Sequence, residues 1–392
     1  MKHHLIKLVF ISCLIKMIAA EKISLQTAYN AKMSYLENDH IKVGVDLNHG
    51  GAIVFLSHAD GLNMINNYDL GRQVQLSFFS GPVPFSVEGQ EPAEHWKHIG
   101  WNPIQTGDDF KNPSQILVHN NDGKIIYVRC RPMQWALNNV PGDCTFESWL
   151  ELEGCVVKAR ARINNARDDH KQYRARLQEL PAVYANAAFH RVGSYTGARP
   201  FKGEPVSESE IPKPTGKHPW SFWYGTESWS ALLNDQDYGL GLITPGKIYY
   251  TGGFAGEIGE NDTFGNSTSY LAGQSLDILD HNINFEFSYE LMAGSIDEIR
   301  SRAIKYQPKY LPKWTFTQDR QGWHFINAKD KGWPIANHLD VMLEMNDPQL
   351  ISPLAFWNSE DAPFLIMEAA FHTSHEHATL FWHRHGEAAP RK

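Results

Sequence analysis

The sequence is short of several features that would assign it to a class of protein at once. Its 392 residues include only 4 cysteines, and no stretch beyond the first twenty residues is long and apolar enough to span a membrane. Lysine and arginine (36) are outnumbered by aspartate and glutamate (44), and the basic residues form no patch. We therefore expect no nucleic-acid partner and no membrane partner. The chain also has no internal repeat and no low-complexity tract.

The first twenty residues have the pattern of a signal peptide. A positively charged start is followed by an apolar stretch over 8–18 and by the small residues Ala19-Ala20 at a cleavage position. The alternative, an uncleaved anchor, is disfavoured because the apolar stretch is too short to cross a bilayer. We expect a secreted, extracellular protein. In a eukaryotic host, the sequons that begin at Asn261 and Asn266 would then be available for glycosylation.

Export also permits a disulfide. Cys13 would leave with the signal peptide, so Cys130, Cys144 and Cys155 remain, and one of the three must stay unpaired. We expect one bridge within this trio, with the pair left open. A catalytic thiol is disfavoured because no histidine in a suitable context lies beside any of the three.

Short apolar runs at close spacing, separated by turn signals, predict an all-β fold. The clearest hairpin signal is Asn-Asn-Asp-Gly at 120–123, between runs at 115–119 and 124–131. Only 295–306 has a helical apolar stripe, with Ser295 as its N-cap. We expect a large antiparallel β-sandwich. Further strands are predicted over 41–45, 52–56, 72–78, 145–152, 156–164, 178–184, 220–233, 239–244 and 285–292.

The chain changes character near residue 312. The proline-containing run 307–312 is the best candidate for a linker, and the runs 364–371 and 378–382 predict strands of a second β module. The predicted organisation is a signal peptide over 1–20, a sandwich domain over 21–312 and a C-terminal module over 313–392.

One predicted strand has an unusual polar face. Val74 and Leu76 alternate with Gln73, Gln75 and Ser77, which is the period of a strand. Amides and a hydroxyl replace the lysines and glutamates of an ordinary solvated face. Such a face suits a polar, uncharged ligand such as a sugar, and we expect it to line a hollow.

Aromatic and acidic residues gather in the run 95–109. Trp96, Trp101, His98 and Asp108 lie within it, and aromatic planes suit the C–H faces of sugar rings. Each residue also has a structural alternative. At least half of the tryptophans are expected in the core, His98 can be a satisfied core histidine, and Asp108 can form a turn.

Four further residues complete the candidate set. Arg72 could hold a substrate carboxylate, or form an ion pair with Asp69. Burial would raise the pKa of Glu179 towards that of a useful acid, although Glu179 could equally make a structural hydrogen bond. Tyr184 is a candidate base or a core residue, and Glu227 lies in a tryptophan-rich run.

The predicted sandwich domain resembles a known family. The Gly-Gly-Ala-Ile sequence at 50–53, the Gly-Arg-Gln-Val-Gln sequence at 71–75 and the strand order are similar to galactose-mutarotase-like proteins. The resemblance implies a β-supersandwich, which recurs in polysaccharide lyases and glycosidases. Epimerases of this kind place His, Glu and Arg on a concave sheet, and the related lyases use a Tyr or His base facing a uronate.

The C-terminal module resembles jelly-roll carbohydrate-binding domains. The resemblance rests on Asp319, on Gly322-Trp323 and on the run 348–353, and the module departs from the pattern by ending early. Nearby histidines at 372, 375, 377, 383 and 385 have a spacing that could bind Zn or Cu, but no cysteine or well-placed acid completes a shell. We expect a solvated strand edge, with no metal and no cofactor.

The leading hypothesis is a carbohydrate-active enzyme that uses acid–base chemistry: a polysaccharide lyase, a glycosidase or an epimerase. The alternatives are a non-catalytic glycan-binding or matrix protein, and a metal-binding protein built on the C-terminal histidines. The candidate catalytic residues are Glu179, His98, Asp108 and Tyr184, and the candidate substrate-binding residues are Arg72, Gln73, Gln75, Trp96, Trp101 and Glu227.

Overall fold

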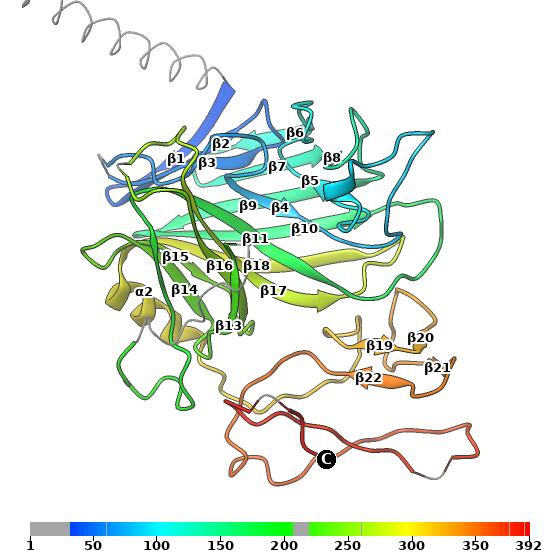
Figure 1. Ribbon diagram of the computed structural model, residues 1–392. Coiled ribbons are helices and arrows are strands. Elements are labelled where there is room, and N and C mark those ends of the chain that lie inside the picture. The colour runs from blue at the N-terminus through cyan, green and yellow to red at the C-terminus, as the bar shows by residue number, and fades with distance from the viewer. Residues whose placement is uncertain (1–31, 60, 207–218, 260, 376, 388) are drawn as a thin grey trace, which may run out of the picture.

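A computed structural model describes residues 32–392 apart from 60, 207–218, 260, 376 and 388 (Figure 1). The predicted signal peptide lies outside the described residues. In the part of the chain that is described, no helix has the length and apolar character needed to cross a membrane.

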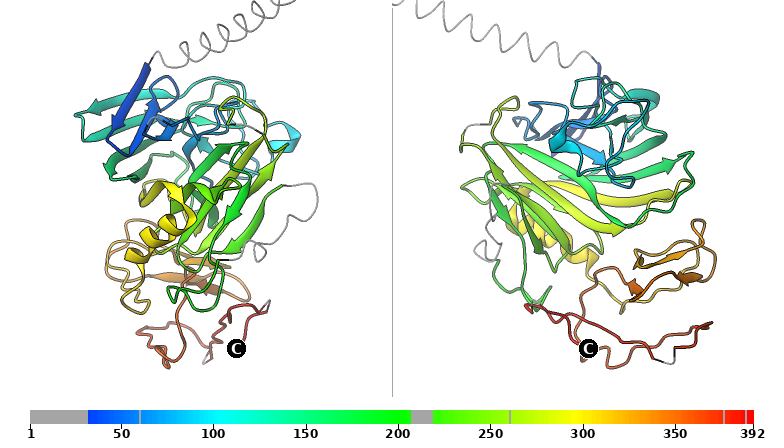
Figure 2. Two further views of the ribbon diagram at one scale, coloured as in Figure 1. Left: turned by 90° about the vertical axis from the view of Figure 1, so that its left-hand side faces the viewer. Right: turned by 45° about the vertical axis from the view of Figure 1, so that its right-hand side comes forward.

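Two large antiparallel sheets form the body of the protein, as expected for an all-β sandwich (Figures 1 and 2). The first has the order β1-β2-β3-β4-β11-β17-β16-β13, with β5 and β8 attached beside β4. Its strands are β1 (Met33–Glu37), β2 (Ile41–Asp46), β3 (Ala52–His58), β4 (Val74–Ser77), β5 (Pro103–Ile104), β8 (Met133–Gln134), β11 (Arg176–Asn186), β13 (Ser221–Tyr224), β16 (Tyr249–Ala255) and β17 (Thr268–Asp277).

The second sheet has eight strands in the order β12-β14-β15-β18-β10-β9-β7-β6. The predicted strand over 220–233 is in fact two strands, one in each sheet, with a turn between them. The strands of the second sheet are β6 (Gln115–Asn121), β7 (Ile125–Arg131), β9 (Cys144–Glu153), β10 (Val156–Asn165), β12 (Arg191–Gly193), β14 (Trp229–Leu233), β15 (Tyr238–Ile243) and β18 (Asn284–Ser295).

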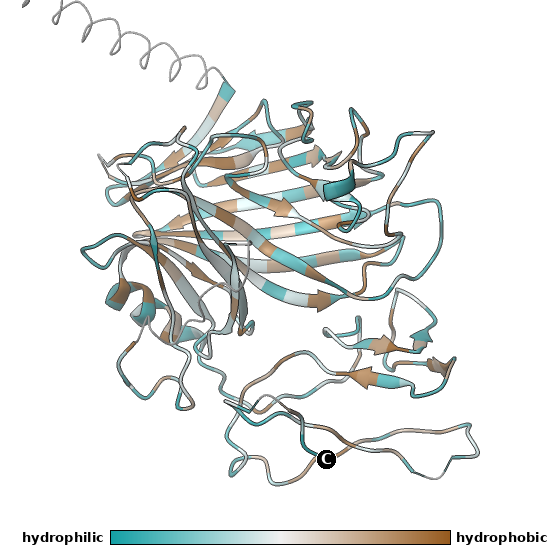
Figure 3. Ribbon diagram, in the orientation of Figure 1, coloured by the Kyte–Doolittle hydropathy of each residue, from teal (hydrophilic) through white to brown (hydrophobic). Residues whose placement is uncertain are grey.

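The hydrophobic core lies between the two sheets. Apolar side chains alternate with polar ones along most strands, which gives the banded pattern of Figure 3. Phe78, Phe146, Leu271 and Leu291 are almost completely buried there. Each large side chain buried in this way contributes about 1.5–3 kcal/mol. The alternating pattern therefore fixes which face of each strand points into the sandwich.

The predicted helix is confirmed as α2 (Ile296–Ala303), followed by the short η4 (Ile304–Tyr306). The Ser295 hydroxyl accepts the Glu298 backbone N–H, and the Glu298 carboxylate accepts the Ser295 backbone N–H, so the two form a capping box. Ile299 and Ala303 are buried against the second sheet. The helix covers part of the outer face of the second sheet and does not cover the first sheet.

Strand β11 lies in the middle of the first sheet, between β4 and β17. This position is unusual for a strand that contains a proline, Pro181, because proline cannot donate to a ladder. The proline is accommodated because both ladders shift register between Glu179 and Ala182, where β11 contains one extra residue.

The three described cysteines are free thiols, so the predicted disulfide does not form. In the ladder between β7 and β9, Cys130 lies opposite Phe146 rather than Cys144. Cys155 follows the opposite end of β9, far from Cys144. Cys130 and Cys144 are both buried in the core, and burial raises the pKa of each thiol.

The C-terminal segment contains two small sheets. One pairs β19 (His324–Ile326) with β22 (Gln349–Ile351), and the other pairs β20 (Ala328–Asp330) with β21 (Val341–Leu343). The strands expected over 364–371 and 378–382 do not form. The domain boundary at 312 and the jelly-roll resemblance remain predictions. The five histidines at 372–385 are exposed, and within the described residues no group of three or more potential metal ligands is found.

A buried ion cluster fastens this segment to the sandwich. Arg320 donates to Asp280, in the connection between β17 and β18, at 2.6 Å and to Asp330 on β20 at 2.7 Å. Gln172 donates to Asp330 at 2.6 Å. The side chains of Arg320, Asp280 and Asp330 are almost fully buried. Each charge is therefore compensated by its ion-pair partners and not by water.

We predict that Arg320→Ala lowers the free energy of unfolding by about 3–5 kcal/mol, because it leaves two carboxylates buried without their cation. Urea denaturation measures this, and limited proteolysis should show earlier cleavage within 313–392. The control is Arg391→Ala, which removes an exposed pair with Glu387 and should change little. An unchanged midpoint for Arg320→Ala would contradict the anchoring role of the cluster.

Candidate functional site

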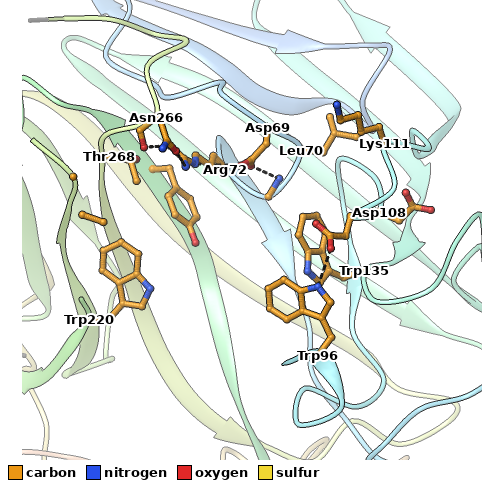
Figure 4. A pocket seen from close by; sticks show the side chains of 15 residues that line it. Asp69, Leu70, Arg72, Trp96, Asp108, Lys111, Trp135, Trp220, Asn266 and Thr268 are labelled. Carbon is orange, nitrogen blue, oxygen red and sulfur yellow. Dashed lines mark hydrogen bonds and ion pairs between the residues drawn. The ribbon is translucent and has the colours of Figure 1, made fainter. Parts of the chain in front are cut away.

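A cleft of about 530 Å³ lies over the outer face of the first sheet (Figure 4). This volume is in the range of small-molecule sites. Its walls include Trp96, Trp135, Trp220 and Tyr184, which come from four separate parts of the chain. Aromatic rings therefore surround the space from several directions.

Arg72 holds the loop before β4 against the loop before β17. Its guanidinium donates to the Asn266 carbonyl oxygen at 2.7 Å and to the Asn266 side-chain oxygen at 2.9 Å. Its Nε lies 3.4 Å from the half-exposed carboxylate of Asp69 (Figure 4), so the predicted pair with Asp69 is present. The guanidinium also lies over the Tyr68 ring, 4.7 Å from its centroid. Arg72 thus sets the shape of one wall and brings positive charge to it.

The opposite wall is built around Trp96. Its indole N–H donates to the Asp109 carboxylate at 2.8 Å, and its ring packs edge-on against Trp135 at 5.9 Å between centroids. Asp109 and Lys111 lie on the same loop and also line the cleft. This wall offers a carboxylate and an ammonium group beside two aromatic rings.

The floor beside the cleft is formed by β11 and β17. Tyr184 and Tyr270 are opposite each other in the ladder, with ring centroids 4.8 Å apart, and Trp220 lies 5.0 Å from Tyr270. The Tyr270 hydroxyl donates to the Glu179 carboxylate, and the Ser77 hydroxyl makes a second hydrogen bond to it. A chain of contacts therefore connects Glu179 to two residues of the cleft wall.

Burial controls protonation in this group. Burial raises the pKa of Glu179 from its ordinary value, and the hydrogen bonds from Tyr270 and Ser77 only partly oppose the rise. Burial also raises the pKa of Tyr184 and of Tyr270, and the nearby Glu179 carboxylate adds to both effects. Both phenols therefore remain protonated at neutral pH, and burial shifts Glu179 towards its neutral, protonated form.

The structure brings four of the sequence-predicted residues to the cleft: Arg72, Trp96, Asp108 and Tyr184. Asp108 is different from the other three because its carboxylate is already saturated. It accepts backbone N–H groups at 110, 112 and 139 and the Asn112 side chain. Asp108 therefore orders the loop, as its structural alternative expected, and its carboxylate is not free for proton transfer.

Gln73 and Gln75 lie under the cleft wall and do not line it, contrary to our expectation. Both are almost fully buried. Gln73 donates to the Asp69 carbonyl oxygen at 2.5 Å, and Gln75 donates to the Leu70 and Arg72 carbonyl oxygens. The two amides support the 69–72 loop from below. Alternation indicated the correct face of the strand, but the loop covers that face.

Three other candidates lie outside the cleft. Trp101 is fully buried in the core, where its indole N–H donates to Asp143 at 3.0 Å. Glu227 forms a buried bidentate ion pair with Arg300 of α2, at 2.8 and 2.9 Å. His98 is exposed and is not part of the cleft wall. The binding roles predicted for Trp101 and Glu227 are therefore corrected to structural ones.

The two sequon asparagines lie near the same loops. Asn266 is exposed and engaged with Arg72, as described above, and Asn261 accepts a hydrogen bond from Asn186. Glycosylation at either position remains a prediction.

Several residues of the site were missed from the sequence. Tyr270 lies on β17, which was not predicted, although alternation within 268–277 could have indicated a strand. Trp135 and Lys111 lie in irregular segments. No local sequence pattern predicts that these irregular segments come together at the cleft.

Comparisons with known proteins give a likeness of fold. No protein-family model matches the chain, and no curated protein matches it. Solved structures do match. A galactose mutarotase-like protein from Clostridium acetobutylicum is 11% identical with a TM-score of 0.41, covering 67% of this chain and 95% of that one. One from Lactobacillus casei is 12% identical with a TM-score of 0.39, covering 66% and 99%.

A third match is the 4-alpha-glucanotransferase from Thermococcus litoralis, 12% identical with a TM-score of 0.32, which covers 68% of this chain and 38% of that one.

We predict that Glu179→Gln becomes more stable relative to wild type as the pH rises. The folded-state pKa of Glu179 is raised, so its stability contribution is complete below the unfolded-state pKa and is lost as the pH rises through the folded-state value. The glutamine variant does not titrate. Urea unfolding at a series of pH values measures the difference.

The matched control is Glu360→Gln, which changes an exposed side chain and should keep a constant offset from wild type. The quantity to follow is the free energy of unfolding of Glu179→Gln minus that of wild type. If this value stays flat or falls as the pH rises, Glu179 is not held in a desolvated state.

Proposed function

We propose that the cleft binds carbohydrate. The observation that carries the proposal is the combination of three indoles and a tyrosine around one space with charged groups at its edge. Aromatic faces complement the C–H faces of sugar rings, and the charged groups can bind sugar hydroxyls or a uronate carboxylate. The predicted signal peptide supports a site of action outside the cell, on an extracellular glycan.

The cleft is lined by charged side chains of both signs. Arg72 contributes a guanidinium on one wall, and Lys111 contributes an ammonium on another. Asp69 and Asp109 keep the site mixed in charge. Three of their four carboxylate oxygens already have a partner: Arg72 and the Gly71 backbone N–H at Asp69, and the Trp96 indole N–H at Asp109. Neutral and uronate glycans should therefore both be tested.

The first test is binding to alginate, hyaluronan, laminarin and xylan by isothermal titration calorimetry. We predict that Trp220→Ala weakens binding by at least about tenfold, because the indole is a central aromatic contact of the cleft. The matched control is Trp357→Ala, an exposed tryptophan of the C-terminal segment that should bind as wild type does. Failure of wild-type protein to bind any of the four glycans, or equal binding by both variants and wild type, would contradict the proposal.

A second proposal is that the site is also catalytic, with Glu179 as the proton-transfer group. The observation that favours it is a half-buried carboxyl of raised pKa, held by Tyr270 beside the cleft. In this arrangement Glu179 would give or take a proton, Tyr270 would position it, and Arg72 would offset negative charge. A polysaccharide lyase, a glycosidase and an epimerase all use such a group.

Product analysis separates these reactions from non-catalytic binding. A lyase releases unsaturated uronate ends, a glycosidase releases saturated reducing ends, and an epimerase changes ring configuration without cleavage. We expect Glu179→Gln to lose turnover while it keeps glycan affinity within about threefold of wild type. Binding with no product from the wild-type protein would instead identify a glycan-binding or matrix protein.

A further inference from the structure

Exposed aromatic side chains continue from the cleft to the edge of the first sheet. Phe222 and Tyr224 lie on the edge strand β13 and are 46% and 47% exposed. Both rings pack against Tyr249 on β16, with centroids 5.5 and 5.4 Å away. We call Phe222, Tyr224 and Tyr249 the edge platform.

The ladder register places the edge platform on the same face as the cleft. Phe222 is opposite Thr251, Thr251 is opposite Ala272, and Ala272 is opposite Ala182 of β11. Trp220 of the cleft wall is two residues before Phe222. Alternate residues of a strand are about 6.7 Å apart, so the rings at 220, 222 and 224 repeat at roughly the length of one sugar unit.

Glu179 is on the same face of the sheet as both surfaces. Tyr249 of the edge platform is opposite Gln274, and Gln274 is opposite Glu179, which makes the separation two strands, or about 10 Å. On its other side Glu179 bonds to Tyr270, which contacts the cleft wall. A ligand that occupied the cleft and the edge platform together would therefore lie over the face of the sheet that carries Glu179.

We propose that the edge platform holds further sugar units of a chain whose other part occupies the cleft, so that the ligand is an oligosaccharide or polysaccharide. This inference rests on the proposed carbohydrate-binding function. A monosaccharide would fill the cleft and leave the platform unused. Among the described residues β13 is the last strand of the sheet and its rings are about half exposed, so a chain can continue past them. The hydroxyls of Tyr224 and Tyr249 can exchange hydrogen bonds with sugar hydroxyls.

The test compares a disaccharide with an octasaccharide of whichever of the four polysaccharides the wild-type protein binds. We expect Phe222→Ala/Tyr224→Ala to bind the octasaccharide about tenfold more weakly and the disaccharide as wild type does. Trp220→Ala should weaken binding of both. The matched control is Tyr310→Ala/Phe371→Ala, which removes two exposed rings that follow the sandwich in the chain and should change neither affinity.

Unchanged octasaccharide affinity in the double variant would overturn the edge platform, while leaving the cleft proposal in place. Equal loss for both ligands would also overturn it, because the effect would then not depend on chain length. Loss of self-association in sedimentation experiments, without an effect on either sugar, would assign the rings to contact with a second copy. A variant that binds the disaccharide with the affinity of wild type is correctly folded. If the double variant does not fold, Tyr224→Ser takes its place.

Discussion

The extra residue in β11 decides which side chains can act together. Side chains of a regular strand alternate, so two residues three positions apart point to opposite faces. Glu179 and Ala182 are three apart, yet their ladder partners Gln274 and Ala272 are only two apart. The bulge therefore turns Glu179 to the outer face that also carries Tyr184. Without it, the carboxyl would point into the hydrophobic core.

Buried polar groups then hold the site in shape from below. Gln73 and Gln75 bind the carbonyl oxygens of the 69–72 loop, and Arg72 on that loop binds Asn266 in a segment almost two hundred residues away in the chain. Loss of any of these hydrogen bonds would lower stability, because a buried amide group without a hydrogen-bond partner costs free energy. These contacts join the cleft wall to the sheet below it and to the loop before β17.

Local patterns predicted most of the fold and part of the site. Alternation predicted β4, β9 and β10, and a capping serine predicted α2, because those signals lie within a few residues. The same alternation gave Gln73 and Gln75 the correct face, but it could not show that a loop folds over them. Glu227 and Trp101 were misassigned for a similar reason: their partners Arg300 and Asp143 are distant in the sequence. Trp135 and Tyr270, which complete the site, meet their neighbours only through tertiary folding.

The most direct measurement of the central claim is a crystal structure of the protein with a bound oligosaccharide. The account predicts a sugar ring against Trp220 in the cleft, with the chain continuing onto the edge platform. An oligosaccharide bound only on the C-terminal segment or on the second sheet, with the cleft vacant, would contradict it.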